Sequence, residues 1–563
     1  MSRIFLLTAA SVFGLIASAS VAKADGQPPA FVGSAPFTWS GMYIGYQSGA
    51  AWGEMRVSDP FGPSVFGDKI HTPGSFAGGV IGFNWQIGSA VFGVEADANW
   101  ADIEGTNTCY AASGFTVSSN CRAHTDAFGT LTGRLGFAVG STGRSLLYVK
   151  GGAAWEDRSI DTTLNSALGP FPPIVSPASA SSSETTWGWT VGAGVEHAFL
   201  GGWSMKAEYD YLNFGSTNIN TPAGLTQIGP FTFLVTPGVT AKASDDEHIF
   251  KLGMNYRFGG APDGGSIREP AYAGVSGIEF EFGARYVYGW GRFQKDLGVA
   301  GVGVNGLASR LTYDDMNTNG GELLARLDTR QNFMFKGLVG FGSGNDGKMN
   351  DEDWFLPGVP FIAYSNTLSS ADDRITYGTI DAGYDWLRGS GYKAASFVGY
   401  NVFSQNMKAF GCAQLASPFS DCVPPIPTSV LGITEKDTWQ SIRLGSAADF
   451  YVLPRVKVSA DVAYLPYVWF DGTDNHVLRS LVSPENGHGQ GVQVDLTVSY
   501  AVTDQFSLGV GGRYWSMFTT SGETNFGGSG IFVPQRFAVE QAAVLVQGSY
   551  KFGGDSCCAG PLK

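Results

Sequence analysis

The chain has 563 residues, of which 15% are charged and 13% aromatic, and its formal net charge is −14. This length exceeds one ordinary small domain, and the low charged share with 79 glycines is unusual for a soluble globular protein. The mean hydropathy of +0.01 argues against a helical membrane protein, and the negative charge argues against binding nucleic acid.

The first 24 residues have the pattern of a secretory signal peptide. Arg3 gives a positive start, residues 4–16 are mostly apolar, and Ala22-Lys23-Ala24 fits a small-x-small cleavage site. We therefore expect cleavage near Ala24 and export of the chain. No later uncharged apolar run reaches about 18 residues, so a membrane-spanning helix is not expected.

Alternation of apolar and polar residues dominates the rest of the chain. Residues 203–211 (WSMKAEYDY) and 492–500 (VQVDLTVSY) each place apolar side chains on one face and polar ones on the other. Such segments are about ten residues or longer, are rich in terminal aromatics, and are joined by alternating short and long connections, which is typical of outer-membrane barrels. A closed barrel also satisfies every backbone group in lipid, so we favour it over a soluble sandwich.

The barrel pattern occurs twice. We predict about eight strands from 39 to 258 and about ten from 277 to 552, the third and sixth of these ten near 332–345 and 439–453. Each half ends in an aromatic-x-Phe strand, which indicates two separate barrels. The predicted fold is all-β, with two transmembrane antiparallel β-barrels in tandem. A single barrel of about eighteen strands is the alternative. The predicted parts are a signal peptide at 1–24, an eight-stranded barrel at 25–258, a Gly/Pro-rich linker at 259–276, a ten-stranded barrel at 277–552 and a tail at 553–563.

The cysteines fall in close pairs. Cys109 with Cys121, and Cys412 with Cys422, would each close a short loop by a disulfide in an oxidising compartment. Cys557 and Cys558 are adjacent. None of the six has zinc spacing with histidine.

Three stretches of the first half carry a family resemblance: residues 37–45 (FTWSGMYIG), 79–85 (GVIGFNW) and the closing 252–258 (LGMNYRF). They resemble the outer-membrane immunogenic proteins, small surface-antigen barrels of Gram-negative bacteria. The resemblance implies an eight-stranded barrel too narrow for a wide pore, with a structural or surface role. Glu95 and Asp97 alternate inward there and are expected to fill the lumen with polar pairs.

Two polar motifs of the second half are both predicted at the external end of the barrel. An exported barrel starts in the periplasm, so the connections near 346–372 and 473–488 are external. The first holds Asp351 and Asp353, and the second holds Asp474 and His476. Each pair has i, i+2 spacing, which puts both side chains on one face of an extended chain. Strands three and seven of a ten-stranded barrel lie nearly opposite, so the pairs would face each other across the mouth.

These four side chains could together activate a water molecule. A histidine near neutrality takes a proton from water, and an adjacent carboxylate orients it and stabilises its charged form. Two neighbouring carboxylates raise each other's pKa, so that one of them can stay protonated.

At these residues the second half resembles the omptins, the outer-membrane aspartyl-type endopeptidases, over about residues 275–552. The resemblance rests on residues 351–354 (DEDW) and 474–476 (DNH). It implies that Asp351, Asp353, Asp474 and His476 are catalytic, with His476 as the base oriented by Asp474, and with the two other aspartates holding the water and the substrate carbonyl.

The resemblance also implies partners and specificity. It implies outer-membrane lipid, a requirement for lipopolysaccharide, no other cofactor and no metal, and peptide or protein substrates at the cell surface. Omptins prefer basic peptides and use acids on the first and seventh strands, where this chain has Gly291 and Gly472.

Residues 351–354 also allow interpretations without catalysis. Residues 351–353 with Asp346 and Asn350 also suit a solvated loop or a calcium site. Trp354 also suits an anchor at the membrane interface. The alternative function is a non-enzymatic outer-membrane surface antigen or porin-like barrel.

Overall fold

The computed structural model describes residues 37–58, 69–111, 117–140, 142–166, 179–221, 224–228, 231–236, 239–258, 278–298, 307–353, 365–389, 391–416 and 422–553. Nearly all of these lie in antiparallel strands, apart from turns and short 3₁₀ segments at Leu200–Gly202, Val477–Arg479 and Phe526–Gly528. Among them, no helix has the length and apolar character needed to cross a membrane. The predicted signal peptide, the linker and Trp354 lie outside the described residues.

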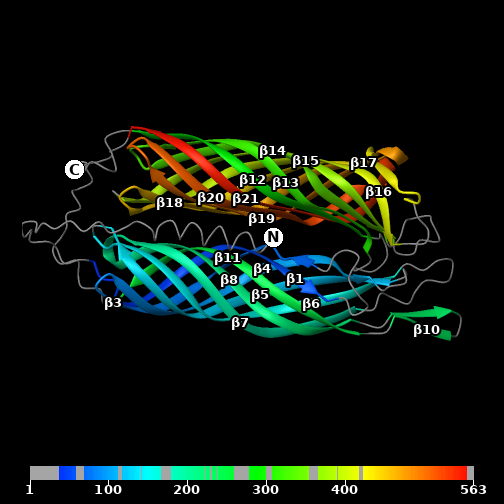
Figure 1. Ribbon diagram of the computed structural model, residues 1–563, viewed down its shortest axis with the longest axis horizontal. Coiled ribbons are helices and arrows are strands. Elements are labelled where there is room, and N and C mark those ends of the chain that lie inside the picture. The colour runs from blue at the N-terminus through cyan, green and yellow to red at the C-terminus, as the bar shows by residue number, and fades with distance from the viewer. Residues whose placement is uncertain are drawn as a thin grey trace, which may run out of the picture. The chain divides into compact units, whose positions relative to one another are not determined.

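The first half closes into a barrel of eight long strands (Figure 1). Each strand pairs with its neighbours in chain order, and the last pairs with the first, from Tyr43 opposite Arg257 to Val57 opposite Ala243. A short β2 (Lys69–His71) also pairs with β1, and β9 (Gly224–Ile228) and β10 (Phe231–Thr236) form a separate hairpin. The eight wall strands are β1 (Gly41–Val57), β3 (Gly74–Ile87), β4 (Ala90–Ala111), β5 (Val117–Val139), β6 (Ser145–Ser166), β7 (Ser179–Ala198), β8 (Trp203–Thr221) and β11 (Val239–Arg257).

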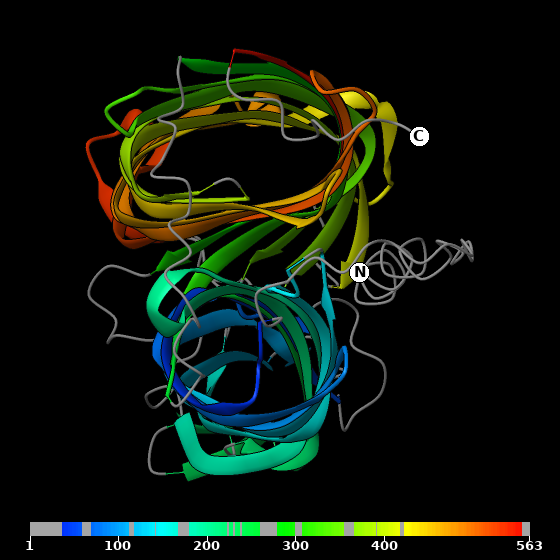
Figure 2. The same ribbon diagram turned by 90° about the vertical axis from the view of Figure 1, so that its left-hand side faces the viewer.

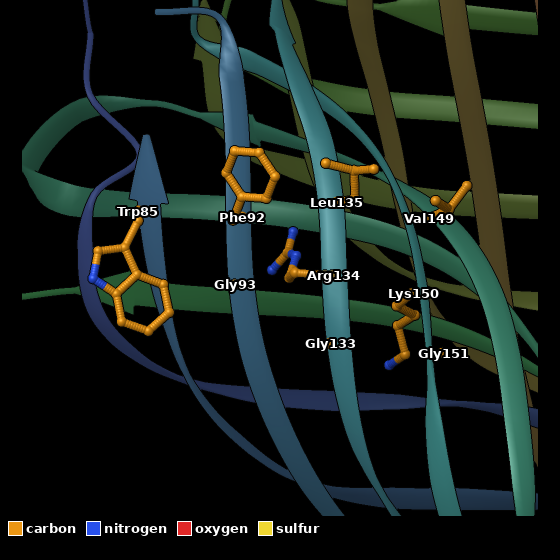
Figure 3. Close-up of a pocket in the computed structure, with 9 residues that line it drawn as sticks. All are labelled: Trp85, Phe92, Gly93, Gly133, Arg134, Leu135, Val149, Lys150 and Gly151. Carbon is orange, nitrogen blue, oxygen red and sulfur yellow. The ribbon is translucent and has the colours of Figure 1, made fainter. Parts of the chain in front are cut away.

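Along the strands of the first barrel, apolar side chains that face outward alternate with polar side chains that face inward. This is the pattern expected of a wall between lipid and a polar lumen. Phe92 and Leu135 are 47% and 43% exposed on the outer face, whereas Arg134 and Lys150 are buried inside. Figure 3 shows these side chains on neighbouring strands, beside glycines that leave a shallow hollow in the outer face.

The lumen of the first barrel is filled by ion pairs. Lys150 Nζ lies 3.0 Å from Glu95 Oε1, and Lys251 Nζ lies 3.0 Å from Asp97 Oδ2, with all four side chains fully buried. The prediction that Glu95 and Asp97 fill the lumen with polar pairs is therefore confirmed.

The second half forms a closed barrel of ten antiparallel strands. Its last strand pairs with its first, from Phe280 opposite Phe552 to Leu297 opposite Gln535. Figure 2 shows each set of strands as a closed ring, so the predicted pair of barrels is confirmed and a single barrel of about eighteen strands is excluded. The ten strands are β12 (Glu279–Gly298), β13 (Leu307–Asp328), β14 (Phe333–Asp353), β15 (Ser365–Gly389), β16 (Tyr392–Ala416), β17 (Ile426–Leu453), β18 (Val456–His476), β19 (Leu481–Ala501), β20 (Phe506–Asn525) and β21 (Phe532–Phe552).

The strands of the second barrel extend further outward than predicted. The third strand was expected to end near residue 345 but β14 continues to Asp353, and the sixth was expected from 439 but β17 begins at Ile426. β14 stays paired with both neighbours as far as Asp353, and β17 is paired with both neighbours from Ile433 onward. The four predicted site residues therefore lie on strand ends, which corrects their assignment to external loops.

An apolar belt marks the part of the second barrel that lies in lipid. Along β14 the exposed large apolar side chains end at Phe341, and along β18 they end at Trp469. About 9–11 tilted residues cross a bilayer, whereas β14 and β18 each have 21. The segments beyond Phe341 and Trp469 therefore project above the membrane.

Packed side chains fill the lumen below the outer rim of this barrel. A buried apolar cluster includes Phe293, Met349, Trp439 and Phe470, each at most 2% exposed, and strands all around the wall contribute to it. Beneath it lies a layer of ion pairs, such as that between Arg513 and Glu322 at 2.7 Å. Residues at the rim therefore stand on a packed floor.

Both predicted disulfides are present. Cys109–Cys121 joins β4 to β5, and Cys412–Cys422 joins β16 to the segment before β17. The first disulfide therefore links two neighbouring strands, and the second links a strand to the connection that follows it. Cys557 and Cys558 lie outside the described residues.

Candidate active site

Asp474 and His476 lie at the outer end of β18 and face the lumen, on the same side of the strand as the buried Phe470. His476 Nε2 is 3.0 Å from Asp474 Oδ2, and the two side chains are 20% and 10% exposed. Because the carboxylate holds Nε2, Nδ1 is the ring nitrogen that remains to accept a proton.

Asp351 and Asp353 lie at the outer end of β14. They share the strand face of Met349, which packs in the lumen cluster, so they also face inward. Asn350 faces the opposite side, where its amide donates to Asn366 Oδ1. Asn350 and Asp351 therefore do not converge on one ion, and the alternative calcium site there is not supported.

The two pairs interact electrostatically. Burial raises the pKa of Asp351 to about 8, reinforced by the charge of Asp353 and opposed by those of His476 and Arg479. Burial lowers the pKa of His476, but its hydrogen bond to Asp474 and the charges of Asp474 and Asp351 outweigh this and raise it overall. The structure thus brings all four predicted residues to one mouth, where Asp351 keeps its proton at neutral pH.

Lys295 reaches Asp474 from β12. Its Nζ lies 3.2 Å from Asp474 Oδ2, 2.5 Å from Glu435 Oε2 and 3.1 Å from Glu485 Oε1. Burial raises the pKa of Asp474, but the Lys295 ammonium and the hydrogen bond from His476 lower it to about 2. Asp474 is therefore ionised throughout the physiological range.

Three further carboxylates lie beside Asp474. Glu435 stands opposite Asp474 in the register of β17 and β18, and Gly472 stands between Asp437 of β17 and Glu485 of β19. Burial and mutual repulsion raise the pKa of Asp437 and of Glu485 well above the usual range. Asp437 and Glu485 therefore favour their protonated, neutral forms unless a cation lies beside them.

The sequence-based prediction missed Lys295, Glu435, Asp437 and Glu485. Glu435-Lys436-Asp437 repeats the acid-x-acid spacing of residues 351–353, and this repeat is the sequence signal that could have identified Glu435 and Asp437. It was passed over because the sixth strand was expected to begin at residue 439. Lys295 belongs to no motif, and only the closed barrel shows what it reaches.

The glycines at the positions of the omptin specificity acids have different surroundings. A Cβ on Gly291 would lie 2.2 Å from Gln541 Nε2, so the Gln541 side chain occupies that space. A Cβ on Gly472 would lie 2.9 Å from Asp437 Oδ1 and 3.1 Å from Glu485 Oε2. Acidity is therefore present around Gly472, but neighbouring strands supply it.

The fold and the lipid-facing belt define the class: this is a β-barrel protein of the Gram-negative outer membrane. The family described as outer membrane protein beta-barrel domain matches residues 8–258, and the omptin family matches residues 314–530. The chain therefore belongs to the outer-membrane beta-barrel family through its first barrel and carries an omptin domain in its second. The omptin domain is of the protease class.

Two outer-membrane proteins of known sequence agree with the assignment of the first barrel. The 31 kDa outer-membrane immunogenic protein of Brucella melitensis is 30% identical over 268 residues, covering 46% of this chain and 100% of that protein. The 22 kDa outer membrane protein of Rhizobium leguminosarum bv. viciae is 29% identical over 223 residues, covering 39% of this chain and 79% of that protein. The solved structure of outer membrane protease OmpT from Escherichia coli is 14% identical, with a TM-score of 0.40, covering 49% of this chain and 97% of that chain.

Proposed function

We propose that the second barrel is an omptin-like, aspartyl-type endopeptidase that cleaves peptide bonds at its external mouth. The observation that carries this proposal is the hydrogen-bonded Asp474–His476 pair, which faces the same lumen as Asp351 and Asp353 and shares their electrostatic field. The omptin match over residues 314–530 spans all four residues and supports the proposal.

In the proposed reaction a water oxygen attacks the peptide carbonyl carbon. His476 accepts the proton of the water at Nδ1, and Asp474 stabilises the imidazolium through Nε2–H. Protonated Asp351 donates a hydrogen bond to the carbonyl oxygen as negative charge develops there, and Asp353 holds the water. His476 then returns the proton to the leaving amine, which breaks the carbon–nitrogen bond.

The alternative of a porin-like second barrel has less support. A conducting pore needs a water-filled lumen, whereas buried side chains such as Phe293, Trp439 and Phe470 pack across this one. For the first barrel we propose a structural or surface role, because its inward charges are paired with one another.

Substitution of the pair on β18 tests the protease assignment. We expect Asp474→Ala and His476→Ala to lower cleavage of quenched fluorescent peptides by about 10²–10⁴-fold, because each removes general-base catalysis. The full chain is assayed in detergent micelles containing lipopolysaccharide, with folding verified by heat-modifiable gel mobility. Asp346→Asn, an exposed change on β14, is the matched control. Equal cleavage by all four proteins would rule out the proposed mechanism.

We further propose lipopolysaccharide as the lipid partner and cell-surface peptides or proteins as substrates. This proposal rests on the omptin domain and on the location of the mouth above the belt. Wild-type protein is expected to cleave peptides in micelles containing lipopolysaccharide and to lose that activity without it. Undiminished cleavage in lipid-free detergent would contradict the requirement.

A further inference from the structure

The mouth contains a group of carboxylates that the proposed reaction does not use. They lie against Gly472: a Cβ at this position would lie 2.8 Å from Phe470 Cζ, 2.9 Å from Asp437 Oδ1 and 3.1 Å from Glu485 Oε2. Any larger residue at 472 would push these atoms apart. The glycine therefore leaves the space above its Cα to two acids from the neighbouring strands.

The oxygens that point into this space lack donors. Lys295 occupies Glu435 Oε2 and Glu485 Oε1, whereas Glu435 Oε1, Glu485 Oε2 and both oxygens of Asp437 have no hydrogen-bond donor among the described residues. Glu435, Asp437 and Glu485 are at most 4% exposed. A buried carboxylate without a donor or counter-ion is costly, so this arrangement calls for a second cation besides Lys295.

The cations beside these carboxylates do not reach all of them. Among the described residues, Lys295 forms ion pairs with Glu435, Asp474 and Glu485, and no ion pair reaches Asp437. A second cation beside Asp437 would neutralise the acid that Lys295 does not reach.

We propose that Glu435, Asp437 and Glu485 bind a hard divalent metal cation such as Ca²⁺ beside Gly472. All the donors are carboxylate oxygens, which hard cations prefer, and both oxygens of Asp437 lack a hydrogen-bond donor among the described residues. One oxygen from each residue lies within 4.8 Å of the others, so the three can converge on one ion.

The proposed ion would brace the site without taking part in the reaction. It would join β17 to β19 across β18, the strand that carries Asp474 and His476. It would also balance the carboxylates that compete with Asp474 for Lys295. Lys295 would then hold Asp474 in place as a positioning residue.

Calorimetric titration of the chelator-treated full chain with CaCl₂ at pH 7.5, in micelles free of lipopolysaccharide, tests the proposal. Wild-type protein is expected to bind one Ca²⁺ per chain. Asp437→Asn and Gly472→Ala should each weaken binding by at least about tenfold. Gly472→Ala keeps every charge and only displaces the Asp437 and Glu485 oxygens, so it separates a site of defined geometry from general acidity. Asp346→Asn should bind as wild type does.

A further variant tests the competition with the lysine. Lys295→Met removes the ammonium and should tighten Ca²⁺ binding, with folding verified by heat-modifiable mobility. Absence of Ca²⁺ binding by wild-type protein, or unchanged binding in Asp437→Asn and Gly472→Ala, would overturn the proposal. So would a wild-type protein that does not bind Ca²⁺ while Asp437→Asn selectively loses cleavage beside lysine, because the three acids would then bind a substrate side chain.

The metal-site proposal rests on the proposed protease function only for its location, and the two can fail separately. His476→Ala should abolish peptide cleavage and leave Ca²⁺ affinity unchanged, because His476 is not a ligand of the proposed ion. A wild-type protein that binds Ca²⁺ but cleaves no peptide would support the metal site and contradict the protease assignment.

Discussion

Two aspartates of the same rim have opposite protonation at neutral pH. Asp351 has a pKa of about 8 because burial and the charge of Asp353 disfavour its ionised form. Asp474 has a pKa of about 2 because the Lys295 ammonium and His476 outweigh its burial. One residue type thus supplies a hydrogen-bond donor on β14 and a permanent anion on β18, which is the division of roles that the proposed reaction needs.

These pKa shifts predict a bell-shaped pH dependence of peptide cleavage. Activity should rise as His476 loses its proton above its ordinary pKa, and fall above about pH 8 as Asp351 ionises. The charges acting on His476 are Asp474 on its own strand, Asp351 on β14 and Lys295 on β12. The measurement is kcat/KM against pH in the full chain.

Asp351→Asn tests the origin of the falling limb. Because the loss of activity above about pH 8 is assigned to ionisation of Asp351, an asparagine, which does not titrate, should abolish that limb and should also lower the maximal rate. Asp346→Asn should shift neither limb. A falling limb that stays near pH 8 in Asp351→Asn would show that Asp351 is not the group that titrates there.

At the scale of elements, single-residue bulges turn the site inward. In β14 the pairing with β15 moves from Gly344 to Gly347 while the partner advances only from Asp373 to Ala371, and β18 has a matching extra residue between Leu465 and Val468. Each bulge reverses which side chains face the lumen. Lys336 and Asp351 therefore both face inward although their numbers differ in parity.

Pro466 lies in the β18 bulge, where its missing N–H is tolerated. Deletion of Pro466 removes the extra residue, so Asp474 and His476 should turn outward and cleavage should fall to the level of His476→Ala. Pro466→Ala keeps the chain length and should retain cleavage to within about tenfold, because the register is preserved. Both are measured on folded, heat-modifiable protein, and full activity in the deletion variant would contradict the role of the bulge.

At the scale of the molecule, each barrel closes on its own first strand. β11 pairs with β1 and β21 with β12, so neither half needs the other to satisfy its backbone hydrogen bonds. We propose the domain limits 25–258 and 277–552 on this basis. The two segments, expressed separately and refolded in detergent, should each show heat-modifiable mobility, and the second should cleave peptides. A second segment that refolds only with the first would contradict these limits.

The sequence by itself determined the barrels, the disulfides and the four residues of the proposed site. Alternation with period two fixes strands that separate lipid from lumen, and the aromatic-x-Phe endings at Phe258 and Phe552 mark where each barrel closes. The i, i+2 spacing of Asp351 with Asp353, and of Asp474 with His476, holds each pair to one face whatever the register.

Only the tertiary structure decided what surrounds those residues. The strand ends above the membrane have weak alternation, so β17 appeared to begin after Glu435 and Asp437, and bulges shift parity in ways that a repeating pattern does not record. Lys295 is 179 positions from Asp474 in sequence, yet ring closure brings its ammonium within 3.2 Å of that carboxylate. Contacts across a lumen depend on strand number and register together, and no local stretch of sequence contains both.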